Sequence, residues 1–496
     1  MSWGWSSARG RILSGAWLGV LTCVIPPGLV DEAVGDGLAW EMRLRLLPAR
    51  VTAYFVLGLC LFSGSSYSRV FTQVTAGLGL ASPATTALTA ARRRLGEKPL
   101  ESLFRRLCAP LSPGTQPWSH VGGLLAVAWD GTTVDTADSP ANAAAFGRPA
   151  TGKGKPAAAF PQIRLVTLVA CGTRALLGAA CGPLRGAGTG EPDLARATLG
   201  SLRAGMLLLA DRGFYSYRLW TAAAATGAHL LWRVKAGQHL PVTRELPDGS
   251  CLTHVNDPRA VAARHDKNGK RRRRGSSLPP DHGPLPGLTA RLIAFTLTVT
   301  ADDGTTLTTR YRLLTTLTDH RAYPAADLAA AYARRWAAET SYREWKTCLR
   351  GTGRTLRGRD PVLARQELWA CLAVYQAIRT LITLAAARTG TDPARLSFTT
   401  ALDAARRTPP AARDHLDTAL AQAEAEILAS PVPERKGRVY PRAVKRPASR
   451  YPSRNHKTGP ISQHAQCTLA LTTPDTATPT APHQRKNPSQ PPDNPP

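Results

Sequence analysis

Four side chains that could handle phosphate and metal ions share one stripe of a predicted helix. Residues 328–349 (LAAAYARRWAAETSYREWKTCL) are rich in alanine and in long, straight side chains, which favour helix. At about 100° per residue, the stripe brings together Tyr332, Arg335, Glu339 and Lys346. A carboxylate between two cations and a phenol suits a metal ion next to phosphate oxygens. The same stripe is also typical of a solvated helix face with ordinary charge pairs.

Two more carboxylates follow short, strongly apolar runs upstream. The run from Leu124 to Trp129 indicates a buried central strand, which delivers Asp130 at its end. The run from Met206 to Ala210 (MLLLA) indicates a second buried strand, which leads into Asp211. A turn explains one such Asp-Gly sequence as well as a site does. Two buried strands that each end in a carboxylate repeat one geometry, and this repetition favours a site.

The surrounding pattern alternates strands with helices, which predicts an α/β core. Further strands are expected at 163–169 and 229–234, and helices are expected at 191–202, 215–226 and 366–387. From about 238 to 318 the pattern becomes purely β.

In this β-rich stretch, strands are expected at 252–255, 292–300 and 305–317. Residues 258–284 between them are poor in apolar side chains, which favours a mobile loop. The role of the arginine-rich part of this loop, 267–275, is left open by the sequence.

The first 110 residues are predicted to be helical, with two apolar runs at 12–24 and 51–62 as buried helices. Both runs are shorter than the roughly 18 residues of a membrane span. The first run imitates a secretory signal, but prolines and a polar helix start follow it instead of a cleavage site. The arginines at 92–94 and 105–106 are either solvated charges or contacts to DNA phosphates.

The charge of the chain is extreme for its size. It has 496 residues, a formal net charge of +29 and a pI near 10.6, which favours a polyanion such as nucleic acid or an anionic membrane surface. With 43 % hydrophobic residues, two to four globular domains are expected. Nine cysteines without a CxxC motif indicate a reduced, cytosolic protein.

Together, these motifs resemble the DDE transposases of bacterial insertion sequences, in the group similar to insertion sequence four that has a β-strand insertion and a Y-R-E-K signature. The signature Y-x2-R-x3-E-x6-K lies on the stripe described above. The family's first aspartate motif is similar to residues 130–132 (DGT), which are followed by Asn142 and Phe146. Its second aspartate motif is similar to residues 209–214 (LADRGF). Downstream, Leu356-Arg357, Pro361 and 366–369 also resemble the family, and the likeness covers roughly residues 20–460.

The resemblance implies a ribonuclease-H-like mixed sheet, interrupted by a β-rich insertion, with a helical N-terminal domain and a basic, partly disordered C-terminal region. Six parts are expected: a helical DNA-end-binding domain (1–110), the first part of the core (111–237), and the β insertion with its basic loop (238–318). The second part of the core (319–390), a helical and basic region (391–471) and a disordered Pro/Thr-rich tail (472–496) follow.

The resemblance also assigns roles to residues. Asp130, Asp211 and Glu339 are implied as ligands of two Mg²⁺ or Mn²⁺ ions, which prefer oxygen ligands. Two such ions, about 3.5–4 Å apart, would stabilise an in-line displacement at phosphorus. Residues implied to hold the DNA are Tyr332, Arg335, Lys346, Trp336 and, from the second aspartate motif, Arg212.

Trp336 could stack a flipped base or could be a core aromatic. Trp232 is a weaker candidate for the same stacking role.

The expected function is therefore cut-and-paste DNA transposition in the bacterial cytoplasm. The expected partner is double-stranded DNA, both the terminal inverted repeats and the target, with a dimer when two ends are paired and no membrane. Two alternatives remain: a non-catalytic DNA-binding protein derived from a transposase, and a structure-specific nuclease on the same fold.

Overall fold

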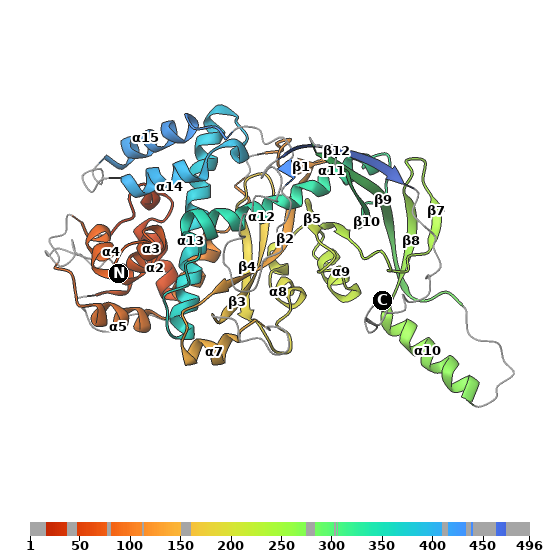
Figure 1. The fold of residues 1–496 in the computed structure, drawn as a ribbon, viewed down its shortest axis with the longest axis horizontal. Helices are drawn as coiled ribbons and strands as arrows, with labels where there is room; N and C mark the ends of the chain where they lie inside the picture. The colour runs from red at the N-terminus through yellow and green to blue at the C-terminus, as the bar shows by residue number, and fades with distance from the viewer. Residues whose placement is uncertain are drawn as a thin grey trace, which may run out of the picture.

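The computed structural model describes residues 16–36, 47–76, 81–111, 114–149, 160–273, 283–301, 304, 306–408, 415–432, 438–439 and 463–472. One half of the molecule is helical and the other is built on a twisted sheet (Figure 1). The predicted tail from 472 and most of the basic stretch 435–457 lie outside the described residues.

The helical half combines segments from both ends of the chain. From the N-terminal part come η1 (Leu21–Cys23), α2 (Pro27–Asp36), α3 (Ala49–Leu61), α4 (Tyr67–Val74), α5 (Thr85–Leu95) and α6 (Lys98–Leu107). From the C-terminal part come α13 (Pro361–Thr389), η5 (Pro393–Arg395), α14 (Phe398–Arg407) and α15 (Leu416–Leu428). In Figure 1, α13 runs between the N-terminal helices and the sheet.

Helix α13 is long and apolar enough to cross a membrane, but 83 % of its most apolar window is buried inside the protein. It begins with Pro361 at the first position, where the missing N–H costs nothing, and Asp360 accepts a hydrogen bond from the N–H of Leu363. It ends at Gly390, whose φ of +66° suits a helix C-terminus. We therefore assign α13 as the core helix on which the other helices pack.

Two N-terminal predictions need correction. The described part of 12–24 is not a regular helix: Gly19 has a φ of +60°, in the left-handed region, and only the 3₁₀ turn η1 follows. Arg92 is fully buried, where it pairs with Glu367 at 3.8 Å and donates to Gln366 at 3.0 Å. Arg92 therefore joins α5 to α13 and cannot reach a DNA phosphate from the surface.

Five strands form the centre of the sheet: β2 (Leu124–Asp135), β3 (Gln162–Ala170), β4 (Leu176–Pro183), β5 (Met206–Ala210) and β6 (His229–Arg233). They lie in the order β4-β3-β2-β5-β6. The first three in sequence pair antiparallel, and β5 and β6 pair parallel beside β2. This order and these directions confirm the ribonuclease-H-like mixed sheet.

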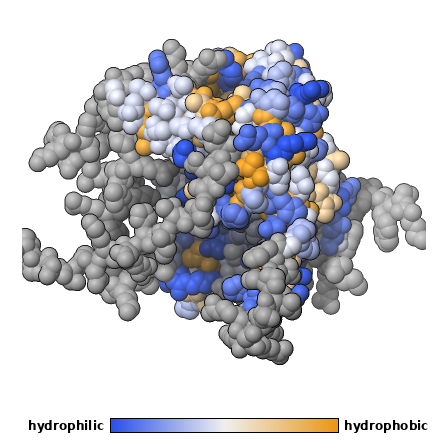
Figure 2. Space-filling view, turned by 90° about the vertical axis from the view of Figure 1, so that its right-hand side faces the viewer, coloured by the Kyte–Doolittle hydropathy of each residue, from blue (hydrophilic) through white to orange (hydrophobic). Residues whose placement is uncertain are grey.

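The β-rich insertion extends the same sheet. It contains β7 (Val242–Glu245), β8 (Cys251–Asn256), β9 (Gly287–Ala301) and β10 (Thr306–Thr315), and β10 joins it to β6. Two C-terminal strands, β11 (Arg438–Val439) and β12 (Gln463–Thr472), complete the far edge, where β12 pairs antiparallel with β9. These two strands were not predicted, because residues 391–471 were expected to be helical and basic. The described surface at this end mixes hydrophilic residues with small hydrophobic groups (Figure 2).

The stretch predicted to be a mobile loop is partly helical. Residues 258–273 form α10 (Pro258–Arg273), which projects away from the body (Figure 1). Pro258 lies at its first turn, and Asp257 accepts a hydrogen bond from the N–H of Arg259 at 2.8 Å, so the helix start is well made. Alanines and long basic side chains then favour helix, although none of its described residues is buried. Residues 274–282 lie outside the described part.

The remaining elements connect and cover the sheet. Its small strand is β1 (His120–Val121), and its shorter helices are α7 (Pro140–Phe146), α8 (Glu191–Ala197), η2 (Leu199–Ser201) and α9 (Tyr217–Ala224). Two hydrophobic clusters fill the two faces. One joins the helical half to one face, and the other lies under α8 and α9.

Candidate active site

The register of two parallel strands brings the two aspartates together. Ala128 of β2 pairs with Leu209 of β5, and the same register two residues further on places Asp130 beside Asp211. Neighbouring parallel strands are about 4.8 Å apart, so the two backbones are close enough for both carboxylates to serve one site. Strand β5 ends before Asp211, as predicted. Strand β2 does not end before Asp130: it continues to Asp135, paired with β3.

Side-chain alternation turns both aspartates toward the same face of the sheet. Ala126, Ala128, Leu207 and Leu209 belong to the cluster shared with the helical half, whereas Val127 and Leu208 belong to the opposite cluster. With a period of two residues, Asp130 and Asp211 follow the first set. The signature helix packs on this face.

The signature stretch is not one regular helix, which corrects the prediction for 328–349. It consists of α11 (Ala325–Tyr332), the 3₁₀ turn η3 (Ala333–Arg335), α12 (Trp336–Arg343) and the π-helical turn η4 (Glu344–Leu349). Such π turns add a residue to the turn and are frequent at functional sites. The ideal stripe therefore breaks after α12, and Lys346 is placed by the π turn.

Glu339, on α12, faces Arg335 and approaches Asp130. Arg335 Nη2 donates to Glu339 Oε1 at 3.0 Å, and about 38 % of the Glu339 side chain is exposed. Burial raises the pKa of Asp130 to about 6, with the nearby charge of Arg335 lowering it and that of Glu339 raising it. A carboxylate that folding destabilises in this way, inside a site, is a functional-site candidate.

Arg335 connects both carboxylates and keeps one donor unused. It is 9 % exposed, and its charge interacts with Asp130 and Glu339. Its Nε is buried and has no hydrogen-bond partner among the described residues. Tyr332 is also buried, with its hydroxyl donating to the carbonyl of Ala210 at 3.3 Å, directly before Asp211. These two predicted residues are therefore brought to the aspartates.

Lys346 contacts strand β2 just beyond Asp130. Its ammonium donates to the Thr133 carbonyl at 2.7 Å and to the Thr132 hydroxyl. Burial, and then the charge of Arg350, lower the pKa of Lys346 to about 8. The structure thus brings Lys346 beside the Asp130 motif, where part of its hydrogen-bonding capacity goes to the protein itself.

The predicted aromatic and basic DNA contacts differ in accessibility. Trp336 is 53 % exposed, with the Arg335 guanidinium 5.2 Å from its ring, so it is not a core aromatic. Trp232 is fully buried and packs on Trp129 and Trp220, which removes it as a stacking partner for a base. Arg212 follows Asp211 on an exposed turn, open to a partner.

Sequence reasoning missed three residues at the site. Tyr342 is buried beneath Asp130, and its hydroxyl donates to the Asp130 carbonyl at 2.5 Å. Arg233 lies 3.8 Å from Asp211 and covers the ring of Tyr311. Glu191, at the start of α8, lies against Gly131, where an added Cβ would meet its Cδ at 2.4 Å. Tyr342 lies within the signature stretch of the sequence. Arg233 and Glu191 lie far from it in sequence, and only the folded arrangement brings them to the site.

The three predicted carboxylates are the kind of ligand that a hard divalent cation prefers. Asp130, Asp211 and Glu339 offer only carboxylate oxygens, and the first two share one register and one face. In the described part of the chain, no three His, Cys, Asp or Glu side chains are gathered closely enough to hold a metal ion. Glu339 and Asp211 instead face Arg335 and Arg233.

Comparison with known proteins identifies the family of the chain. Residues 122–376 match the family described as Transposase DDE domain, and residues 16–105 match Insertion element 4 transposase N-terminal. The transposase InsG for insertion sequence element IS4, from Escherichia coli (strain K12), is 27 % identical over 88 % of this chain and 94 % of its own length.

InsZ of the same strain, whose name classes it as a candidate transposase, is 31 % identical over 32 % of this chain and 51 % of its own length. The first family match spans half of the sequence and covers both aspartates and the signature helix. The chain therefore belongs to the DDE transposases, in the group of insertion sequence 4.

Proposed function

We propose that this protein binds the ends of its own insertion sequence and carries out metal-dependent DNA cleavage and strand transfer. One observation carries the proposal: the register of β2 and β5 sets Asp130 beside Asp211, on the face where Glu339 packs. The positively charged side chains of Arg335 and Lys346 lie beside these carboxylates, where they can bind the negative charge of a phosphodiester. A protein that only bound DNA would have no use for three carboxylates among phosphates.

In this proposal Asp130, Asp211 and Glu339 would hold the divalent ions, either Mg²⁺ or Mn²⁺, which would supply charge stabilisation for the displacement at phosphorus. The guanidinium of Arg335, which also bonds Glu339, and the ammonium of Lys346 would hold the non-bridging oxygens of the strand. Tyr332 and Tyr342 keep the two aspartate-bearing backbones in place.

The reaction sequence needs two displacements. Water first attacks the phosphodiester at the transposon end, breaks the bond to the 3′ oxygen and leaves a free 3′-OH. That 3′-OH then attacks a phosphodiester of the target and releases its 3′ oxygen. We place this reaction in the bacterial cytoplasm, with two protomers joined when two ends are paired, and with residues 1–110 contributing to end binding.

A nicking assay tests the proposal. The substrate is a labelled duplex taken from the DNA that flanks the reading frame, with Mg²⁺ or Mn²⁺ added. Asp130→Asn, Asp211→Asn and Glu339→Gln should each abolish nicking and leave duplex binding nearly intact. Glu426→Gln is the matched control, because Glu426 is exposed and pairs with Arg407 on the surface of the helical half. Nicking by any of the three site variants would remove that residue from the site.

Joining separates a transposase from a nuclease on the same fold. The wild-type protein should transfer the freed 3′-OH to a supercoiled target plasmid. Cutting without any joined product would favour the nuclease.

A further inference from the structure

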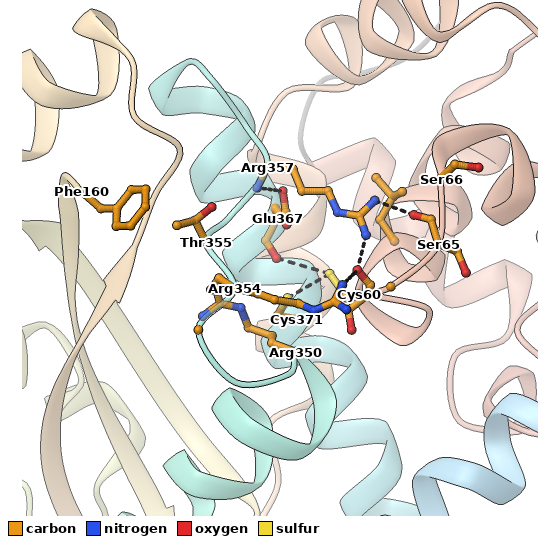
Figure 3. Close-up of a pocket in the computed structure, with 14 residues that line it drawn as sticks. Cys60, Ser65, Ser66, Phe160, Arg350, Arg354, Thr355, Arg357, Glu367 and Cys371 are labelled. Carbon is orange, nitrogen blue, oxygen red and sulfur yellow. Dashed lines mark hydrogen bonds between the residues drawn. The ribbon is translucent and has the colours of Figure 1, made fainter. Parts of the chain in front are cut away.

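A pocket of about 530 Å³ lies between the N-terminal helices and the loop that follows the signature helix (Figure 3). One wall is the turn between α3 and α4, including Ser63 and Ser65. The other wall carries three arginines, Arg350, Arg354 and Arg357. The exposure of the arginines decreases inward: Arg354 is exposed, Arg357 is half-buried and Arg350 is 7 % exposed.

The three arginines bond only to uncharged oxygens. Arg354 Nη1 donates to the Ser63 carbonyl at 2.5 Å, and Arg350 Nη2 donates to the Arg354 carbonyl at 2.7 Å. Arg357 donates to the carbonyls of Ser65, at 2.9 Å, and Ser63. Within the described residues none of the three forms an ion pair with a carboxylate. Carbonyls hold the guanidinium groups in place without neutralising them, so the pocket is strongly positive.

One acid lines the pocket, and its charge is already balanced. Glu367 Oε2 accepts a hydrogen bond from the backbone N–H of Arg357 at 2.9 Å. The same oxygen lies 3.8 Å from the guanidinium of the fully buried Arg92. The three pocket arginines therefore still need an anion from outside the protein.

The pocket is connected directly to the catalytic strand. Leu356, between Arg354 and Arg357, donates its N–H to the Asp135 carbonyl at the end of β2. Arg350 follows Lys346 by about one helical turn. Along β2, the path from Asp130 to Asp135 is about 17 Å at 3.3 Å per residue. The pocket lies beyond the end of this path, so it is a few phosphates away from the reacting bond along a bound strand.

We propose that this pocket binds one backbone phosphate of the transposon end, a few nucleotides from the cut, and so sets the position of cleavage. The inference rests on the proposed function, since it needs DNA at Asp130. The chemistry recognised is the pair of anionic non-bridging oxygens of a phosphodiester, and free inorganic phosphate presents similar oxygens. The strand source is favoured because the loop that carries the pocket arginines bonds to the end of β2 through Leu356, and Arg350 directly follows the π turn that holds Lys346.

The test compares Arg354→Gln with Arg407→Gln. Arg407 is exposed and paired with Glu426, so its variant removes one charge away from the pocket. Loss of one charge-assisted contact should weaken binding of the flanking-DNA duplex by about tenfold. It should also lower the slope of log affinity against log salt by about 0.9. Arg407→Gln should change neither, and Arg354→Lys should recover part of the affinity.

A second measurement uses the wild-type protein and duplexes with a single methylphosphonate, which lacks the phosphate charge. In a series that moves this group along the strand, one position a few nucleotides from the nick should weaken wild-type binding and have no further effect on Arg354→Gln. If Arg354→Gln matched Arg407→Gln while wild type still bound and nicked the duplex, only the pocket inference would be overturned. The same holds if inorganic phosphate raised the melting temperature of wild type alone, with DNA affinity unchanged in Arg354→Gln. A wild type that neither bound nor nicked would overturn the proposed function itself.

Discussion

Glu339 and Glu344 lie on the same helical segment, and their surroundings differ sharply. Glu344 is 4 % exposed and is surrounded by donors: Arg174 at 2.8 Å, the Tyr375 hydroxyl at 3.2 Å and Arg379. Glu339 has one cation, Arg335, and about 38 % of its side chain is exposed. One carboxylate is saturated by the protein, and the other has coordination capacity left for a ligand.

The difference separates a structural ion cluster from a site prepared for chemistry. Burial alone would raise the pKa of Glu344, but the charges of Arg379 and Arg174 outweigh it, and the pKa is lowered. At Asp130 the balance is reversed: burial dominates and the pKa is raised. Charge at Glu344 therefore stabilises the folded protein, whereas charge at Asp130 destabilises it and is kept for function.

The largest expected effect is on folding, from Glu344→Gln. The substitution removes the Glu344 counter-charge from the fully buried Arg379 and the partly buried Arg174, which should lower the free energy of unfolding by about 3–5 kcal/mol. Glu339→Gln should change it by less than about 1 kcal/mol. Urea unfolding followed by tryptophan fluorescence measures both. Equal losses in the two variants would show that the two glutamates are alike.

The second effect comes from Asp130→Asn, which should raise stability and abolish activity. Folding raises the pKa of Asp130 from 3.8 to about 6, so the folded state binds a proton more tightly and stability falls as pH rises between these values. Asp130→Asn removes this penalty and should stabilise the protein by about 1–3 kcal/mol at pH 7–8, while nicking is lost.

The stability gain from Asp130→Asn should shrink as pH falls, and it should vanish below about pH 4. Melting temperatures across this pH range check the linkage. A variant that is destabilised at pH 8 would show that the carboxylate contributes to structure, as Glu344 does.

The third effect is on the pH dependence of nicking. At a metal concentration well below saturation, protons and metal ions compete for Asp130, whose pKa without metal is raised to about 6, and the pKa of Lys346 is lowered to about 8. The rate should then rise through the first value and fall through the second. Lys346→Arg keeps a positive charge at high pH. It should therefore remove the upper limb and leave the lower limb in place. An unchanged upper limb would mean that another group causes it.

The smallest effect is expected from Trp336→Ala, for which the buried Trp345 provides a structural contrast. Trp336 is exposed beside Arg335, whereas Trp345 is fully buried. Trp336→Ala should leave unfolding nearly unchanged and slow second-strand cleavage more than the first nick, if a flipped base stacks there. Trp345→Ala should instead cost about 3–5 kcal/mol of stability. A time course that resolves the nick, the double-strand break and the joined product separates these outcomes.

Local patterns were enough to predict the strands that carry the aspartates. An unbroken apolar run predicts a buried strand, and the run MLLLA at 206–210 coincides with β5. The extension of β2 past Asp130 was missed, because Gly131 to Asp135 contains polar residues that pair with β3 rather than with β5. The in-register pairing of Asp130 with Asp211 depends on contacts between distant segments and could not be read locally.

Other misses have the same origin. An ideal 100° wheel has no place for a π turn, so the route of Lys346 to Thr133 was not foreseen. Charge runs carry no information on burial, so Arg92 was grouped with solvated neighbours although Glu367 and Gln366 enclose it. Composition favoured a loop at α10, where local helix propensity was the better guide.

Strand β12 affects how the protein matures on the ribosome. It pairs with β9 from Ala294 to Ala301, yet its first residue, Gln463, is made long after β9. At 5–20 residues per second, that half of β9 waits on the order of 10–30 s for its partner. During this time it presents an open strand edge to other nascent chains. Slowed or interrupted synthesis should therefore produce aggregation rather than a partly active enzyme, which ties the supply of active protein to the last part of its translation.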